Sequence, residues 1–228
     1  MATTDPVLIK MSEYVEKWKS SKDSRYVFLS CYSMMSTNMI SAIDKREFHD
    51  EVWVKKLLNH FADYYFKSLT CYDCGDLTPK VWEYAHKATL NNELSDLQLL
   101  ILGVNAHINY DLVFALYDML KPEWQTLSEI QKRERYEDHC HVNHVIAKTI
   151  DRVQDEILEP LNPSLEWIDL LFGRMDEFLI SRLIKNWRGN VWDSAQELLK
   201  IDPPEDREYF RLKLEDEVLK RADLISVF

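Results

Sequence analysis

A chain of 228 residues with 46% hydrophobic and 12% aromatic residues can bury one sizeable core, and its length favours a single domain over residues 1–228. The formal net charge of −11 disfavours nucleic acids and anionic membranes as partners, because both are bound through clustered Lys and Arg. Only 4 glycines and 7 prolines are present, too few for the many tight turns of a strand-rich fold, so the composition predicts an all-α fold.

Apolar residues recur at spacings of three and four along most of the chain, which predicts about eight helices in one bundle. In chain order, we expect helices at about 7–19, 24–39, 49–69, 79–90, 95–120, 127–158, 164–201 with a bend near Gly173, and 205–228. Residues 69–78 are expected to form a loop. The first half of the helix at 95–120 is apolar on nearly every side, which predicts a buried position at the centre of the bundle.

The N-terminus lacks a basic segment followed by an apolar run, so no secretory signal is expected. The longest apolar patch, residues 97–104, falls short of the roughly 18 residues of a membrane span. The cysteines are then expected to be reduced thiols. These features together predict a cytoplasmic location.

The middle of the helix at 95–120 carries polar side chains where a buried helix is normally apolar. His107 and Asp111 are four residues apart and therefore project from one face, while Asn105 and Asn109 form a neighbouring pair. Such residues are costly to bury without a purpose. We interpret His107 as a metal ligand or general base, Asp111 as its co-ligand or orienting carboxylate, and the two asparagines as substrate-positioning groups. The alternative is a structural network of buried polar groups.

A metal site needs further ligands from other helices. We expect His60 and His144 to join His107 and Asp111 if their helices pack around the central one. The cofactor would be a divalent metal, zinc first, with iron or manganese as alternatives. A metal-activated water would favour hydrolysis of a small-molecule substrate.

The segment Leu102-Gly-Val-Asn-Ala-His-Ile-Asn-Tyr-Asp-Leu112 resembles the signature of a largely bacterial family of helical proteins, marked by an N-A-H-I-N-x-D-L motif. That resemblance implies a shared site around His107 and Asp111 and gives no reaction. The His-x-x-x-Asp spacing also resembles one element of the zinc-dependent phospholipase C and single-strand nuclease superfamily, whose members are helical and bind a trinuclear zinc cluster. This chain departs from that superfamily because it lacks the secretory signal and the N-terminal Trp ligand.

Other patterns offer alternative sites. Glu83 with His86 and Asp138 with His141 have the Glu-x-x-His-like spacing of di-iron proteins, which would imply an oxygen-using enzyme. Cys71 and Cys74 form a C-x-x-C in the expected loop, which we interpret as a chance pairing.

Two arginines flank a tryptophan near the C-terminal end of the chain. Arg182 and Arg188 either bind an anionic substrate or pair with surface carboxylates, and we expect the pairing.

The sequence therefore favours a small-molecule enzyme, a hydrolase first, centred on His107 and Asp111. A di-iron enzyme and a non-catalytic binding or interaction protein are the alternatives. The substrate and the oligomeric state stay open.

Overall fold

The computed structural model describes residues 5–153, 156–157 and 175–227, and these residues contain helices and no strand. The helices are α1 (Pro6–Ser21), α2 (Tyr26–Asp44), α3 (Glu51–Cys74), α4 (Lys80–Ala88), α5 (Asp96–Ala106), a π-helical segment η1 (His107–Asp111), α6 (Leu112–Leu120), α7 (Glu129–Val153), α10 (Met175–Leu198) and α11 (Pro204–Val227). Since α5, η1 and α6 run on as one continuous helix, the described residues form eight helices, as the sequence predicts. The all-α prediction is confirmed.

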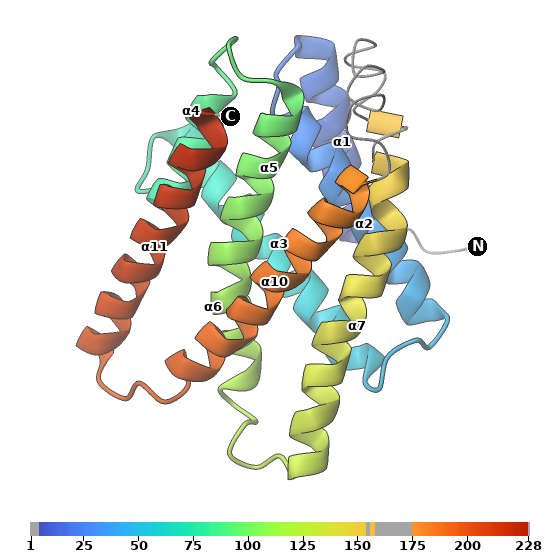
Figure 1. The fold of residues 1–228 in the computed structure, drawn as a ribbon, viewed down its shortest axis with the longest axis vertical. Coiled ribbons are helices and arrows are strands. Elements are labelled where there is room, and N and C mark those ends of the chain that lie inside the picture. Colours follow the sequence, from blue (N-terminus) through green and yellow to red (C-terminus); the bar gives the residue numbers. More distant parts are fainter. Residues whose placement is uncertain (1–4, 154–155, 158–174, 228) are drawn as a thin grey trace.

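The continuous helix Asp96–Leu120 lies at the centre of the bundle (Figure 1). Helices α4 and α11 pack on one side of it, and α2 packs on the other side together with α7, while α3 and α10 cover the remaining faces. Its side chains at Leu100, Leu102, Val113 and Leu116 are buried. The predicted central, buried position is therefore confirmed.

By length and composition this 25-residue helix could also cross a membrane, although the sequence led us to expect no such stretch. It is the one helix with that property in the part of the chain that is described, and most of it is buried inside the bundle. Because the core helix of a helical bundle has the same composition, the feature is weak support for a membrane span.

Helix boundaries follow local capping signals. Asp50 begins α3 by accepting the backbone N–H of Trp53 at 2.9 Å, and Ser95 begins α5 in a capping box with Gln98. Gly75 ends α3 in the left-handed conformation, with φ at 73°, and so satisfies its last carbonyls.

The expected loop at 69–78 is therefore wrong for its first half, because α3 continues through Cys71 to Cys74 before Gly75 ends it. The helix expected at 127–158 begins at Glu129 and is described to Val153. The helix start at Ser164 and the bend at Gly173 lie outside the described residues.

A close approach joins the central helix to α2 at Gly103. A Cβ atom at that position would lie 2.5 Å from Phe28 Cγ and 2.9 Å from Phe28 Cβ, so the whole aromatic side chain would have to move. Phe28 is itself buried among Tyr32, Tyr65 and Trp82. Gly103 is thus required for α2 to pack this closely.

We predict that Gly103→Ala lowers the free energy of unfolding by about 1–3 kcal/mol, because it overpacks a contact that cannot relax cheaply. Gly189→Ala is the matched control, since nothing lies within 4 Å of a Cβ there. On that helix the substitution should stabilise by about 0.5–1 kcal/mol. Urea unfolding of both variants tests this, and an equal effect of the two substitutions would contradict the role of Gly103.

Candidate functional site

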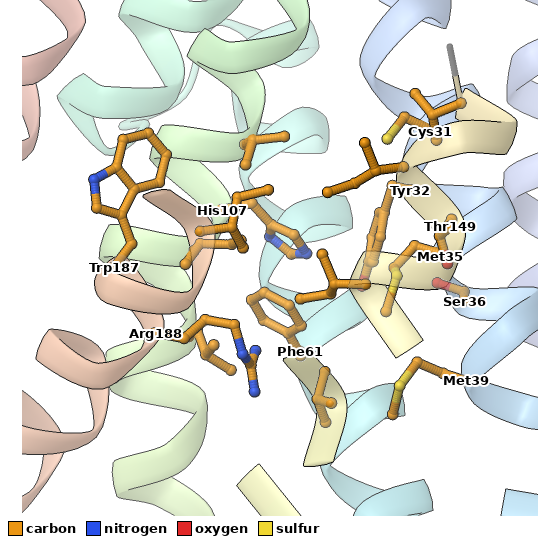
Figure 2. A pocket seen from close by; sticks show the side chains of 18 of the residues that line it. Cys31, Tyr32, Met35, Ser36, Met39, Phe61, His107, Thr149, Trp187 and Arg188 are labelled. Carbon is orange, nitrogen blue, oxygen red and sulfur yellow. The ribbon is translucent and has the colours of Figure 1, made fainter. Parts of the chain in front are cut away.

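A cavity of about 210 Å³ lies between α2, α3, the central helix, α7 and α10. Most of its wall is apolar, as Figure 2 shows, with Met35, Met39, Phe61 and aliphatic side chains around it. The polar side chains that line it are few and include Tyr32, Ser36, His107, His139, Thr149 and Arg188. A largely apolar pocket with a few polar groups is the usual form of a small-molecule site.

His107 and Asp111 meet as the sequence predicts. His107 Nδ1 lies 3.0 Å from Asp111 Oδ2, and the indole N–H of Trp82 donates to the same oxygen at 2.9 Å. Both side chains are almost completely buried. Trp82 comes from α4, so the carboxyl group of Asp111 joins that helix to the central one.

Burial determines the charge state of this pair. Desolvation lowers the pKa of His107 well below its ordinary value and raises the pKa of Asp111 well above its own, while the hydrogen bond from Trp82 opposes the second shift. Both directions favour uncharged forms at neutral pH. The pair therefore places no net charge in the core.

Aromatic rings enclose the imidazole. Its ring stacks on Phe61 with centroids 3.6 Å apart and planes inclined by 6°, and Tyr32 meets it edge-on at 4.4 Å. These contacts restrict the ring to one orientation. The expected base is thus preorganised within the cavity wall.

The central helix adopts a π-helical turn at the position of this pair. Residues His107–Asp111 form η1, and the backbone N–H of Leu112 reaches back to the carbonyl of His107. Single π turns inside α-helices are rare and are often found at functional sites. The sequence predicts only a regular helix here.

Several buried polar atoms of the cavity wall have no hydrogen-bond partner among the described residues. They are His107 Nε2, Tyr32 Oη, Ser36 Oγ and Trp53 Nε1. A buried polar atom without a partner costs about 1–3 kcal/mol. Each of these atoms has almost no accessible surface, so a molecule in the cavity would reach one only after neighbouring side chains shift.

Asn105 and Asn109 are placed away from this cavity. The Asn109 amide donates to Asn105 Oδ1 at 3.0 Å, and the Asn105 amide donates to the carbonyl of Val218 at 3.0 Å. Both side chains are buried and hold α11 against the central helix. Their contacts are structural, in contrast to the substrate-positioning role that the sequence suggested.

The expected metal ligands do not converge. His60 lies near the surface, with its Nε2 2.9 Å from Asp118 Oδ2, and His144 is exposed and stacks on His141. Nowhere in residues 5–153, 156–157 and 175–227 do three or more His, Cys, Asp or Glu side chains come close enough to hold one metal ion. The structure therefore does not bring His60 and His144 to His107 and Asp111, because their helices turn them outward.

The di-iron spacings are also divided between separate environments. Glu83 pairs with Lys87 on the surface, whereas His86 is buried one turn away. Asp138 accepts the backbone N–H groups of His49 and Asp50 at 2.7 and 3.1 Å and so caps the start of α3. His141 contacts Glu47 instead.

Cys71 and Cys74 are free thiols on the last turn of α3. They take part in no metal-binding cluster of the described residues.

We expected Arg188 to pair with surface carboxylates, but it lines the cavity. It is only 5% exposed, and Nη2 donates to the carbonyl of His139 at 2.8 Å while Nε donates to Asn143 Oδ1 at 3.0 Å. Arg182, one turn and a half earlier, is exposed. The surface pairing expected for Arg188 is therefore wrong. A weak signal was its position next to Trp187, which is buried beside it.

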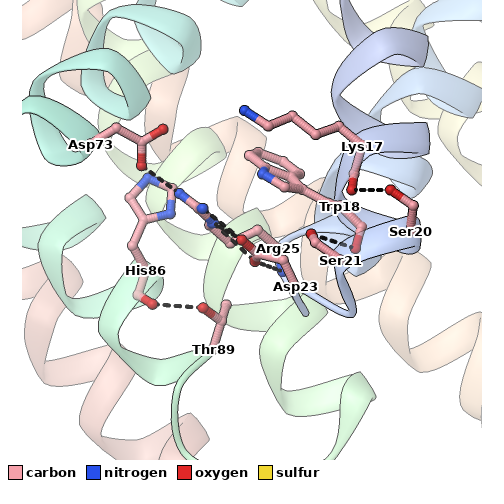
Figure 3. Close-up of polar contacts among 9 residues, drawn as sticks. All are labelled: Lys17, Trp18, Ser20, Ser21, Asp23, Arg25, Asp73, His86 and Thr89. Carbon is pink, nitrogen blue, oxygen red and sulfur yellow. Dashed lines mark hydrogen bonds and ion pairs between the residues drawn. The ribbon is translucent and has the colours of Figure 1, made fainter.

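Trp82, which binds Asp111, also contacts a second group of polar residues. The ring of Trp82 stacks on His86 with centroids 5.4 Å apart, and His86 Nε2 is buried without a partner among the described residues. Beside it, Arg25 binds Asp23 and Asp73 at 2.6 Å each and lies over the Trp18 ring (Figure 3). The space here is about 20 Å³, which suits at most a water molecule.

Comparison with known proteins assigns the chain to a family. The model of a family of unknown function (DUF5995) matches residues 4–227, so the chain belongs to that family. No curated protein matches it significantly, and neither does any solved structure.

We predict that acidification destabilises the protein in part through His86. Burial lowers the pKa of His86 to about 4 in the folded state, whereas an unfolded histidine titrates near 6.5. The unfolded state therefore takes up this proton first, and the free energy of unfolding falls as the pH drops from about 6.5 towards 4. The loss amounts to at most about 3 kcal/mol.

His86→Leu should make this acid limb shallower in urea unfolding between pH 4 and pH 8. At pH 8 the histidine is neutral in both states, so each protein provides its own reference there. An identical pH slope in the variant and the wild type would contradict the assigned shift.

Proposed function

We propose that this member of the family binds a small, largely apolar molecule in the central cavity. The observation that carries the proposal is the space of about 210 Å³ whose wall is largely apolar and includes side chains with unpartnered polar atoms. An apolar cavity of about 150 Å³ is already large enough to bind benzene. The space here therefore suits a ligand somewhat larger than one aromatic ring.

Stability also supports a binding role. Natural cores are packed closely, and voids larger than a water molecule are few because they forfeit packing energy. A space lined by Met35, Leu57, Val142 and Ile184 could be closed by larger side chains at little cost. The cavity is nevertheless present, and a ligand needs such a cavity in order to bind.

The segment Asn105-Ala-His-Ile-Asn-Tyr-Asp-Leu112 contributes side chains to the cavity wall. It also contains the hydrogen-bonded pair of His107 and Asp111. We therefore further propose that this segment, with its N-A-H-I-N-x-D-L pattern, is the functional core of the chain. The described residues provide His107 and Asp111 and no third ligand beside them, so the proposal does not include a metal.

A second candidate function is acid–base catalysis on the bound molecule, the hydrolase hypothesis without its metal. The specific support is the ordered chain Trp82–Asp111–His107, in which a carboxyl group orients an imidazole on a cavity wall. In the present conformation Nε2 is buried under aromatic rings. Catalysis would therefore require one of the surrounding aromatic rings to move when the ligand enters.

We predict that the neutral probe p-xylene raises the melting temperature of the wild-type protein and that Val142→Phe abolishes this effect, because the larger ring fills the cavity. A stabilisation of about 1 kcal/mol by bound probe corresponds to a shift of about 2–4 °C for a chain of this size. Thermal unfolding followed by circular dichroism measures the shift.

Val52→Phe is the matched control for this experiment, because Val52 is 65% exposed and lies outside the cavity. It should keep the full response to p-xylene. A wild-type protein that shows no shift, or a shift that survives in Val142→Phe, would count against binding in this cavity.

We also predict that His107→Phe stays within about 1 kcal/mol of the wild-type stability. A phenyl ring keeps the stack on Phe61 and removes the unpartnered Nε2 atom, while a protonated Asp111 keeps its bond from Trp82. His107→Ala should instead lose about 2–4 kcal/mol, because it leaves a void among the rings.

Urea unfolding distinguishes the two variants. If His107→Phe is as unstable as His107→Ala, the imidazole nitrogens are needed for folding, and the structural-network interpretation of His107 replaces the functional one.

A further inference from the structure

We propose that the ligand of the central cavity carries a carboxylate group and that Arg188 binds it. This inference rests on the proposed function and adds the chemical class of the ligand, an amphipathic monoanion with an apolar body. It is carried by the surroundings of one buried guanidinium group.

Arg188 lines the cavity from α10, on a wall that is mostly apolar. In Figure 2 its guanidinium group extends from α10 towards the region of Phe61. The side chain is 5% exposed, and arginine is almost never buried this far unless it is paired. A buried arginine at this position is therefore expected to have a charged partner.

The hydrogen bonds of Arg188 within the described residues go only to neutral groups. Nε and Nη2 donate to Asn143 and His139, and Nη1 has no partner there. Arg188 forms no ion pair with a carboxylate of the described residues, and its Nη1 group keeps N–H donors without a partner there.

The group is nevertheless charged at neutral pH. Burial lowers its pKa to about 10, which is still well above the pH of a cell. An unpaired charge in apolar surroundings is costly, so a ligand that supplies the opposite charge gains binding energy by relieving that cost.

Among the described residues, no other ionisable group of the cavity wall forms an ion pair with Arg188. Asp138 is occupied at both oxygens by the backbone N–H groups of His49 and Asp50 at the start of α3. His139 and His107 are held neutral because burial lowers the pKa of each. Within the described residues, the guanidinium of Arg188 therefore has no ion-pair partner on the wall, because the carboxylate of Asp138 binds backbone N–H groups instead.

These features select the ligand class. One guanidinium group matches one planar carboxylate, whereas a phosphate dianion would bring a second charge without a partner. The remaining wall consists of side chains such as Leu57, Ile146, Leu183 and Ile184, which favour an alkyl or aryl body. A medium-chain carboxylate has both parts.

The test compares three probes with the same alkyl chain, namely octanoate, octan-1-ol and octylamine, by isothermal titration calorimetry at pH 7. For the wild-type protein we expect octanoate to bind at least about tenfold more tightly than octan-1-ol, since charge-assisted hydrogen bonds are worth more than neutral ones. Octylamine should bind most weakly.

Arg188→Met removes the charge and keeps an unbranched apolar side chain, so the preference for octanoate should disappear while octan-1-ol still binds. Arg188→Lys keeps the charge and should retain part of the preference. Arg182→Met is the matched control, because Arg182 is exposed on the same helix and its loss should change nothing.

The outcomes separate this inference from the proposed function. If wild-type protein binds octan-1-ol as tightly as octanoate, the carboxylate inference fails and the cavity remains a site for neutral ligands. If neither these probes nor p-xylene binds, the proposed function fails as well. Because the comparison of probes uses the wild-type protein, it stands even if Arg188→Met does not fold.

Discussion

The structure depends on pairing the polar side chains of a buried helix. The central helix is apolar enough to be the core of the bundle, yet Asn105, Asn109 and Asp111 are placed in its interior. Each of these can be buried only with a hydrogen-bond partner, because an unpaired group costs more than the hydrogen bond gains. Asn109 finds its partner on the same helix, in Asn105, and two neighbouring helices bind the other two residues. Asn105 fixes α11 through the carbonyl of Val218, and Asp111 fixes α4 through Trp82.

The side of the central helix that faces the cavity differs from the side that faces α11 and α4. Towards α11 and α4, the polar side chains Asn105 and Asp111 of the central helix are paired, while towards α2, α3, α7 and α10 the wall is mostly apolar and includes unpartnered atoms of Tyr32, Ser36 and His107. A bundle selected for stability alone would have replaced those groups with hydrocarbon. The asymmetry agrees with a division into a structural side and a ligand-binding side, which is the basis of the proposed function.

Sequence patterns predicted the elements well because helix formation is governed locally. The periodicity of apolar residues located every described helix, and Ser95 and Asp50 mark helix starts by capping chemistry that is visible in the sequence. The end of α3 was misplaced because Asp73 and Gly75 suggested a longer loop, although only Gly75 is needed to end the helix. The π turn at 107–111 escaped prediction, since it arises from packing around the helix and leaves no mark in the periodicity.

Sequence spacing predicted only the part of the site that lies on one helix. His107 and Asp111 meet because four residues on a helix fix their relation, whatever surrounds them. The positions of His60 and His144 depend on the rotation of two other helices about their axes, which local spacing does not determine, and both face outward. Arg188 was misassigned for the same reason. A charged residue on an amphipathic helix is normally exposed, and only the packing of α10 shows it to be buried.

The two proposals together constrain how a ligand would lie. Arg188 on α10 and His107 on the central helix belong to the wall of one cavity, and burial leaves the first charged and the second neutral. A carboxylate held by Arg188 would direct the apolar body of the ligand towards the aromatic groups around His107. Any acid–base chemistry of His107 would then act on the body of the ligand, while the carboxylate serves for binding and orientation. This arrangement separates recognition from reaction, because charge provides the first and a desolvated neutral imidazole provides the second.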